Sequence, residues 1–160
     1  MNLSKQIATH FRQVFFGGNW TSSNVEETLS GITWLQATQS IYTLNSIASL
    51  TYHINYYVRE VLKVLEGGAL DAHDKFSFDC PPIQSEKDWQ DLKDTTLANA
   101  EKFAALIEAL PDEKFAEVFT IEKYGNYYRN MHGIIEHTHY HLGQIALIKK
   151  ILLQQEMHLL

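Results

Sequence analysis

The sequence predicts an all-α protein, a four-helix bundle with long crossing connections and short extra helices. Four segments repeat apolar residues three and four positions apart, which is the period of a helix with one buried face. Glycine or proline follows three of these segments and ends them. The chain has no repeat of fixed period and no low-complexity segment, so a bundle is favoured over a repeat architecture.

The first predicted helix covers residues 4–15 and ends at Gly17 and Gly18. Its apolar stripe consists of Ile7, Phe11, Val14 and Phe15. Residues 19–44 follow as a structured connector. Within it, residues 23–26 and 33–36 each have the pattern of a capping box, in which the first side chain caps the helix. We therefore expect one or two short helical pieces there.

The second predicted helix begins after a cap at Asn45 or Ser46 and ends at Gly67 and Gly68. Its buried stripe is Ile47, Leu50, Ile54, Tyr57, Val58, Val61 and Leu65. The opposite, polar side carries Asn55, Arg59, Lys63 and Glu66. Residues 69–84 are polar and contain two prolines, so we expect a loop.

Ser85 and Asp88 open a third helix that ends before Pro111. Its inner face is Trp89, Leu92, Thr96, Ala100, Phe103, Ile107 and Leu110. A proline-led helical turn and a partly β-like stretch, Val118–Tyr124, follow. The helical period then returns over residues 128–154, with Ile134, Ile135, Thr138, Leu142, Ile145, Ile148 and Leu152 on one face.

Size and charge limit the functions that this chain can have. Its 160 residues correspond to a single domain, residues 1–160, with enough chain to bury a core. A net charge of -6 without a basic cluster argues against nucleic acid and anionic lipid as partners. The first residues lack the apolar core of a signal peptide, and no stretch approaches about 18 apolar residues. We therefore expect a cytoplasmic protein that does not bind membranes.

Cys80 is the only cysteine, which excludes an internal disulfide and a zinc site built from thiolates. It lies beside Pro81 and Pro82 in a loop, without a helix N-terminus directly after it to lower its pKa, so we expect no nucleophile there. Any metal site must use nitrogen and oxygen ligands.

Residues 137–141 read HTHYH, and their conformation decides which histidines share a side. In a strand, His137, His139 and His141 would all point the same way. The segment continues without a break into an apolar pattern of spacing 3 and 4, which favours a helix. In a helix, His137 and His141 lie one turn apart beside the buried stripe, where two imidazoles can reach one ion. His139 then falls on the polar side, exposed to solvent.

A catalytic metal generally takes three protein ligands and keeps a position open. Of the remaining histidines, His53 alone lies in mid-helix beside an apolar stripe. The others are His10, His73, His132 and His158. Three buried imidazoles without partners would cost roughly 1 to 3 kcal/mol each, whereas one metal ion coordinates all three. Since imidazole must be deprotonated to bind, occupancy should fall as the pH drops below about 6.5.

The segments NSIASLTYH (45–53) and HTHYHLGQI (137–145) resemble the DinB-like superfamily of small bacterial helical bundles. The stretches from Trp20 to Leu29 and IQSEKDW (83–89) are similar to an uncharacterised branch of that superfamily. The resemblance implies a divalent transition metal on three histidines, here His53, His137 and His141, and a homodimer. Both zinc and nickel suit imidazole ligands.

The resemblance implies a small-molecule substrate and one of two activities: transfer of a low-molecular-weight thiol to an electrophile, or metal-dependent hydrolysis. A metal ion on three neutral imidazoles keeps its charge and open positions, and it suits activation of a thiol or of water. Thiol transfer is favoured because several relatives are thought to work that way and because no inward carboxylate is evident near the three histidines. Asp71, Asp74 and Asp79 in the loop are alternatives that could enter the site.

No catalytic residue is identified from the sequence. Tyr57 lies one turn after His53, and Gln144 lies near His141, so each could orient a ligand or donate to developing charge. Packing is the favoured explanation of both residues: Tyr57 as part of the core, and Gln144 as a polar contact between helices.

A non-catalytic alternative is a metal-binding dimeric bundle that acts through a partner. The tyrosines would discriminate, because they favour an enzyme if they line a cavity and a docking surface if they form an outward patch. They are Tyr56, Tyr57, Tyr124, Tyr127, Tyr128 and Tyr140.

Overall fold

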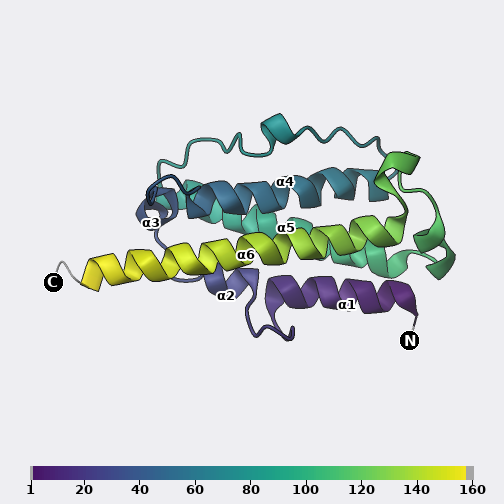
Figure 1. Cartoon of the computed structure of the whole chain (residues 1–160), viewed down its shortest axis with the longest axis horizontal. Helices are drawn as coiled ribbons and strands as arrows, with labels where there is room; N and C mark the ends of the chain where they lie inside the picture. Colours follow the sequence, from purple (N-terminus) through teal and green to yellow (C-terminus); the bar gives the residue numbers. More distant parts are fainter. Residues whose placement is uncertain (1, 158–160) are drawn as a thin grey trace.

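The structure is a computed structural model that describes residues 2–157. Its long helices are α1 (Leu3–Phe16), α4 (Ile47–Leu65), α5 (Glu86–Ala109) and α6 (Tyr127–Met157). Both α5 and α6 pack against α1 and α4, so the four helices surround a common core (Figure 1). No β-strand occurs among the described residues. The prediction of an all-α four-helix bundle is confirmed.

The connector between α1 and α4 contains two short helices, as predicted. They are α2 (Val25–Leu29) and α3 (Trp34–Thr38). The capping box at α3 is present, since Thr33 and Gln36 bond to each other's backbone N–H groups. The predicted capping box at α2 is wrong by one residue, because Asn24 rather than Ser23 caps the helix by accepting from the Glu27 N–H. Asparagine and serine cap equally well, so the local pattern alone did not separate them.

Aromatic side chains fill the core between α1 and α5. Phe11 packs against Phe15 and Phe103 with ring centroids 4.8 and 4.7 Å apart. Trp89 is completely buried, and its Nε1–H donates to the carbonyl oxygen of Ile32 at 2.8 Å. Burial of each such side chain contributes about 1.5–3 kcal/mol to folding. The Trp89 bond also fixes the connector to α5.

Helix α4 is buried on more sides than its sequence pattern predicts. Asn55, predicted on a polar face, is buried, and its Oδ1 accepts from Asn99 Nδ2 at 2.9 Å. Glu60 is buried as well and pairs with Lys63. The reason is that α3, α5 and α6 all contact α4, while residues 69–84 cover its remaining side (Figure 1).

The connections contain three 3-10 turns, at Asp74–Phe76, Asp112–Ala116 and Glu122–Tyr124. The β-like stretch predicted at Val118–Tyr124 forms no strand and is reduced to a single bridge between Val118 and Asn126. A lone extended segment without a partner strand cannot build a ladder.

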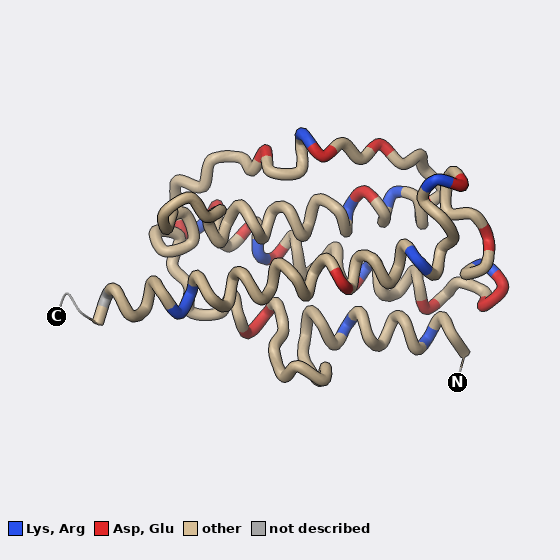
Figure 2. Tube along the Cα trace, in the orientation of Figure 1, with Lys and Arg blue, Asp and Glu red and all other residues tan. Residues whose placement is uncertain are grey.

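Within residues 2–157, no helix combines the length and the hydropathy that a membrane crossing requires. Lysine and arginine are distributed over all four long helices rather than gathered in one segment (Figure 2).

Candidate metal centre

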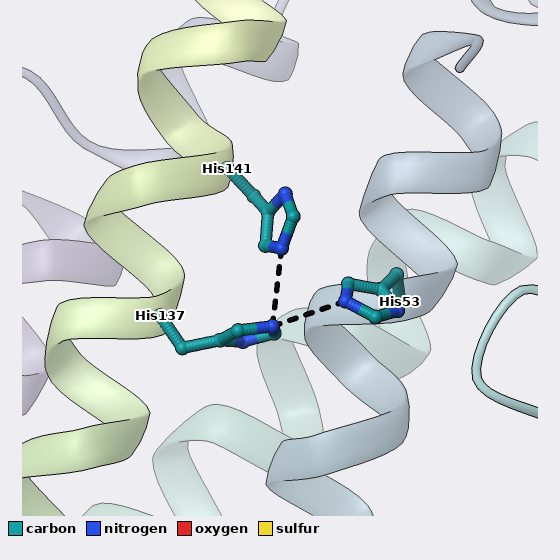
Figure 3. A group of neighbouring side chains, drawn as sticks. All are labelled: His53, His137 and His141. Carbon is teal, nitrogen blue, oxygen red and sulfur yellow. Dashed lines mark hydrogen bonds between the residues drawn. The ribbon is translucent and has the colours of Figure 1, made fainter. Parts of the chain in front are cut away.

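The three histidines predicted as ligands come from two helices that lie side by side. Ser46 caps α4, so the helix begins at Ile47 and carries His53 before its midpoint. An unbroken α6 places His137 and His141 one turn apart on one face. Because α4 packs against α6, the three rings point toward one another (Figure 3). The helical interpretation of residues 137–141 is therefore confirmed.

The three Nε2 atoms converge on one point. His137 Nε2 lies 3.0 Å from His53 Nε2 and 3.1 Å from His141 Nε2, and each ring offers one atom within 4.8 Å of the others. Two nitrogen ligands of one zinc ion, each at about 2.0–2.1 Å, are about 2.8–3.4 Å apart in right-angled to tetrahedral geometry. The separations of His137 Nε2 from the other two Nε2 atoms therefore fit a single transition-metal ion, and the three histidines could hold one.

Hydrogen bonds at the opposite ring nitrogens fix the tautomers of two histidines. His53 Nδ1 lies 3.1 Å from the carbonyl oxygen of Ser77, and His141 Nδ1 lies 2.7 Å from Gln144 Oε1. Because both oxygens only accept, each Nδ1 carries the proton. Each Nε2 in a neutral ring is then a bare lone pair, which is the form that binds a metal.

The three rings hold too few protons to satisfy one another. His137 Nε2 can donate to the lone pair of His53 or of His141, but not to both at full strength. Its own Nδ1 is buried without a hydrogen-bond partner. A buried polar atom without a partner costs about 1–3 kcal/mol. A cation among the three Nε2 atoms would remove the shortage of donors.

Burial keeps these imidazoles neutral. Together with the nearby rings of His141 and His53, it lowers the pKa of His137 to about 4. Burial is also the main cause of the lowered pKa of His53, which the bond to Ser77 partly opposes. The pKa of His141 is lowered by burial against the opposing effect of Gln144. The site is therefore ready to bind a cation at neutral pH without first releasing protons.

Residues 73–78 cover the centre, which the sequence did not reveal. The Phe78 ring stacks on His53 with centroids 3.9 Å apart and planes 9° from parallel. Tyr57 donates to Asp74 Oδ1 at 2.6 Å, and its ring lies edge-on 4.8 Å from the ring of His137. Burial and the bond to Asp74 raise the pKa of Tyr57 to about 12, so its phenol stays protonated. Of the loop aspartates considered from the sequence, Asp74 is the one that reaches this layer.

The two residues suggested as catalytic candidates have defined contacts. Gln144 bonds to His141, so it is more than a contact between helices. Tyr57 is only partly buried and lies between His53, His137 and Asp74. Both side chains contact the histidines or their neighbours, which is the arrangement of groups that orient ligands.

The expectation that His139 is exposed to solvent is wrong. It is half-buried on the face of α6 toward α1, where its ring centroid lies 6.4 Å from that of His10. The His10 ring also contacts His132, with ring centroids 6.4 Å apart. Because α1 packs against α6, a face of α6 that is polar in the sequence is partly buried in the fold. His139 nevertheless lies apart from the three convergent rings, as predicted.

The other candidates do not join the centre. His73 pairs with Asp71 at 3.1 Å and is exposed, and His158 lies outside the described residues. Burial raises the pKa of the Cys80 thiol, which keeps it protonated at neutral pH.

The tyrosines divide between the two arrangements considered from the sequence. Tyr56 and Tyr57 lie beside the centre, where Tyr56 Oη bonds to the backbone of His73. Tyr124 and Tyr127 line a cavity at the start of α6. Tyr140 is 65% exposed, although its ring lies 4.9 Å from the ring of His141.

Comparison with protein families places the chain beside the DinB superfamily. The model of the DinB superfamily matches residues 20–145, a range that includes all three histidines of the centre. Searches of curated proteins and of solved structures gave no match.

Proposed function

Since this chain belongs to the DinB superfamily, we propose that it binds one divalent transition-metal ion, zinc or nickel, through His53, His137 and His141, and transfers a low-molecular-weight thiol to an electrophile. The convergence of the three Nε2 atoms, at 3.0 and 3.1 Å, carries the metal-binding part of the proposal. When bound, such an ion would lower the pKa of a thiol or of water and so supply a nucleophile at neutral pH.

The protein's own contribution begins with orientation of the ligands. The carbonyl of Ser77 and the amide oxygen of Gln144 hold the protons of His53 and His141 on Nδ1 and aim both Nε2 atoms inward. Such supporting bonds typically change metal affinity or activity 10–100-fold when removed. Gln144 is therefore a positioning residue in this proposal.

Two cavities along the seam between α4 and α6 favour a reaction of two organic molecules. A cavity of about 280 Å³ lies one turn beyond His141, lined by Leu50, Gln144 and Ile148 among others and by no charged residue. A cavity of about 350 Å³ lies on the opposite side of the histidines, lined by Tyr57, Asp74 and Ile134 among others. Transfer needs sites for a thiol and an electrophile, whereas hydrolysis needs one organic site and water.

In the proposed reaction the thiol gives up its proton, a sulfur–carbon bond forms, and the leaving group departs with its electron pair. The products are a thioether and the protonated leaving group. Asp74 is the carboxylate best placed to receive the thiol proton and to pass it on. Tyr57 keeps its own proton, because its pKa is raised to about 12, and it can fix Asp74 in place through the 2.6 Å bond.

Hydrolysis is the alternative, and one observation favours it. Asp74, one of the three loop aspartates considered from the sequence, is bonded to Tyr57 beside the histidines, and a carboxylate can act as general base toward water. The absence of an evident inward carboxylate therefore no longer argues against hydrolysis.

A metal-loaded activity screen tests the proposal. The zinc- and nickel-loaded chain would be offered thiols with electrophiles, and separately esters and amides, with His141→Ala as the blank. Thioether formation by the wild-type chain alone is the expected result. Hydrolysis alone would select the alternative, and equal activity of both proteins would refute a role for the metal centre.

A further inference from the structure

The cavity of about 350 Å³ on the Tyr57 side of the histidines extends toward the start of α6. Near the centre it is lined by Tyr57 and by Gly133 and Ile134, which lie one turn before His137. At its far end it is lined by Lys123 and Arg129. Its volume falls in the range of about 300–1,000 Å³ that small-molecule sites occupy. It therefore runs from Tyr57, whose ring contacts His53 and His137, to a pair of cations.

Both carboxylates that line this cavity already have partners. Glu60 is buried and pairs with Lys63 at 2.7 Å and with Arg59 at 3.3 Å. Asp74 accepts the hydroxyl hydrogen of Tyr57.

The two cations have no such partner. Within residues 2–157, no carboxylate pairs with Lys123 or Arg129. Lys123 instead lies over the face of the Tyr124 ring, 5.6 Å from its centroid. Asp74 keeps its negative charge, because its partner is the neutral phenol of Tyr57, and Glu60 is neutralised by its two cations. The two unpaired cations therefore outnumber the one uncompensated carboxylate of the cavity, and this favours an anionic ligand at the cationic end.

The absence of a side chain at Gly125 leaves room for Arg129. It adopts φ +75°, a conformation that side chains rarely take, and a Cβ there would come within 2.9 Å of Arg129 Cδ. The absent side chain thus lets the aliphatic part of Arg129 lie against the turn that leads into α6. Arg129 precedes His137 by eight residues, which is about 12 Å along the helix.

We propose that this cavity binds the anionic end of the thiol substrate, with Arg129 and Lys123 holding a carboxylate while the thiol reaches the three histidines. That the ligand carries a thiol rests on the proposed function. That the cavity binds an anion is a separate claim. The fork of an arginine matches a carboxylate in two parallel hydrogen bonds. The distance along α6 calls for an extended substrate of about tripeptide size, with its carboxylate several bonds from sulfur.

Calorimetric titration with glutathione and with glutathione diethyl ester, in which both carboxylates are blocked, tests this site. The zinc-loaded wild-type chain would be compared with Arg129→Gln and Lys123→Gln. Lys150→Gln is the matched control, because Lys150 is an exposed cation on α6 that does not line the cavity. Thermal unfolding of each variant verifies that it folds.

We expect each cavity variant to raise the Kd for glutathione about tenfold, the usual size for loss of one charge-assisted contact. The Kd of each cavity variant for the diester, and the Kd of Lys150→Gln for glutathione, should differ from the wild-type value by less than about twofold. The anion site would be overturned by equal weakening of glutathione and diester binding, by unchanged binding of glutathione in the variants, or by failure of the wild-type chain to bind glutathione.

The same titration with the metal-free chain separates this inference from the proposed function. If zinc does not bind but Arg129→Gln still weakens glutathione selectively, the metal proposal fails and the anion site stands. If zinc binds at one ion per chain but selectivity for the carboxylates is absent, the anion site fails alone. Displacement of glutathione by succinate, compared with its displacement by glycerol phosphate, then distinguishes a carboxylate site from a phosphate site.

Discussion

His53 donates its Nδ1 proton to the carbonyl oxygen of Ser77, which lies 24 positions later in the chain. Phe78, the next residue, stacks on the same imidazole at a centroid distance of 3.9 Å. One short segment therefore sets both the tautomer and the plane of a ring that lies on a different element. The segment 69–84, expected only as a loop, thus forms part of the candidate metal centre.

Replacement of Phe78 by alanine tests the importance of this stacking. Phe78→Ala should lower zinc affinity about tenfold, because the His53 ring gains freedom that metal binding must then restrict. Phe76→Ala, in the same loop but on His73 rather than on His53, is the control and should change affinity less than twofold. Competition with a fluorescent chelator gives both affinities. Equal effects of the two substitutions would show that loop folding rather than ring stacking matters.

Metal stoichiometry tests the ligand set. The purified chain should hold close to one divalent ion, and His53→Ala, His137→Ala and His141→Ala should each weaken binding by more than about a hundredfold. His139→Ala should retain the ion, since His139 lies toward His10. Elemental analysis after dialysis measures the content. Retention of the ion by all three ligand variants would contradict the proposed centre.

Gln144→Leu tests the support of His141. Loss of the 2.7 Å bond frees the His141 ring and leaves its Nδ1 without this acceptor. Zinc affinity should therefore fall roughly 10–100-fold, the usual effect of removing such a supporting bond. Gln90→Leu on α5, whose side chain bonds to Asp94, is the control. Unchanged affinity for Gln144→Leu would mean that the bond does not orient the ligand.

The metal-free chain should lose stability in acid. The pKa of His137 is lowered to about 4, below the value of about 6.5 of an unfolded histidine. Between these values the unfolded chain binds more protons, so the free energy of unfolding should fall as pH drops from about 6.5 toward 4, while above 6.5 neither form is charged. Urea unfolding at several pH values measures this fall, and His137→Gln should reduce it.

The same lowered pKa values bear on metal occupancy. Because burial lowers the pKa of His53, His137 and His141, protons compete for Nε2 only at lower pH. We therefore expect loss of the ion below, rather than at, the pH of about 6.5 that an unperturbed imidazole predicts. NMR titration of the metal-free imidazoles provides the comparison. Titration of His137 near 6.5 would contradict the structure.

Trp89→Phe tests how the connector is held. Phenylalanine keeps most of the buried ring but removes the donor to the Ile32 carbonyl, 57 residues away along the chain. An unsatisfied buried acceptor costs about 1–3 kcal/mol, so the free energy of unfolding should drop by that amount. Chemical denaturation measures it. A drop below about 0.5 kcal/mol would imply that water replaces the lost bond.

The sequence by itself determined the helices and the three convergent histidines. The helical period and the capping patterns involve residues only a few positions apart in the chain. His137 and His141 share a face simply because a helix has 3.6 residues per turn. The position of His53 beside an apolar stripe was likewise visible, because a buried face must contact another helix. These features depend on local geometry, which the order of residues expresses directly.

Only the tertiary structure decided which groups surround that site. Ser77, Phe78 and Asp74 reach His53 and Tyr57 because a loop folds across α4, and no spacing in the sequence encodes that path. The burial of Asn55 and His139 has the same origin, since neighbouring elements cover faces that are polar in the sequence. Contacts between distant segments depend on how whole helices pack, and local patterns do not specify that packing.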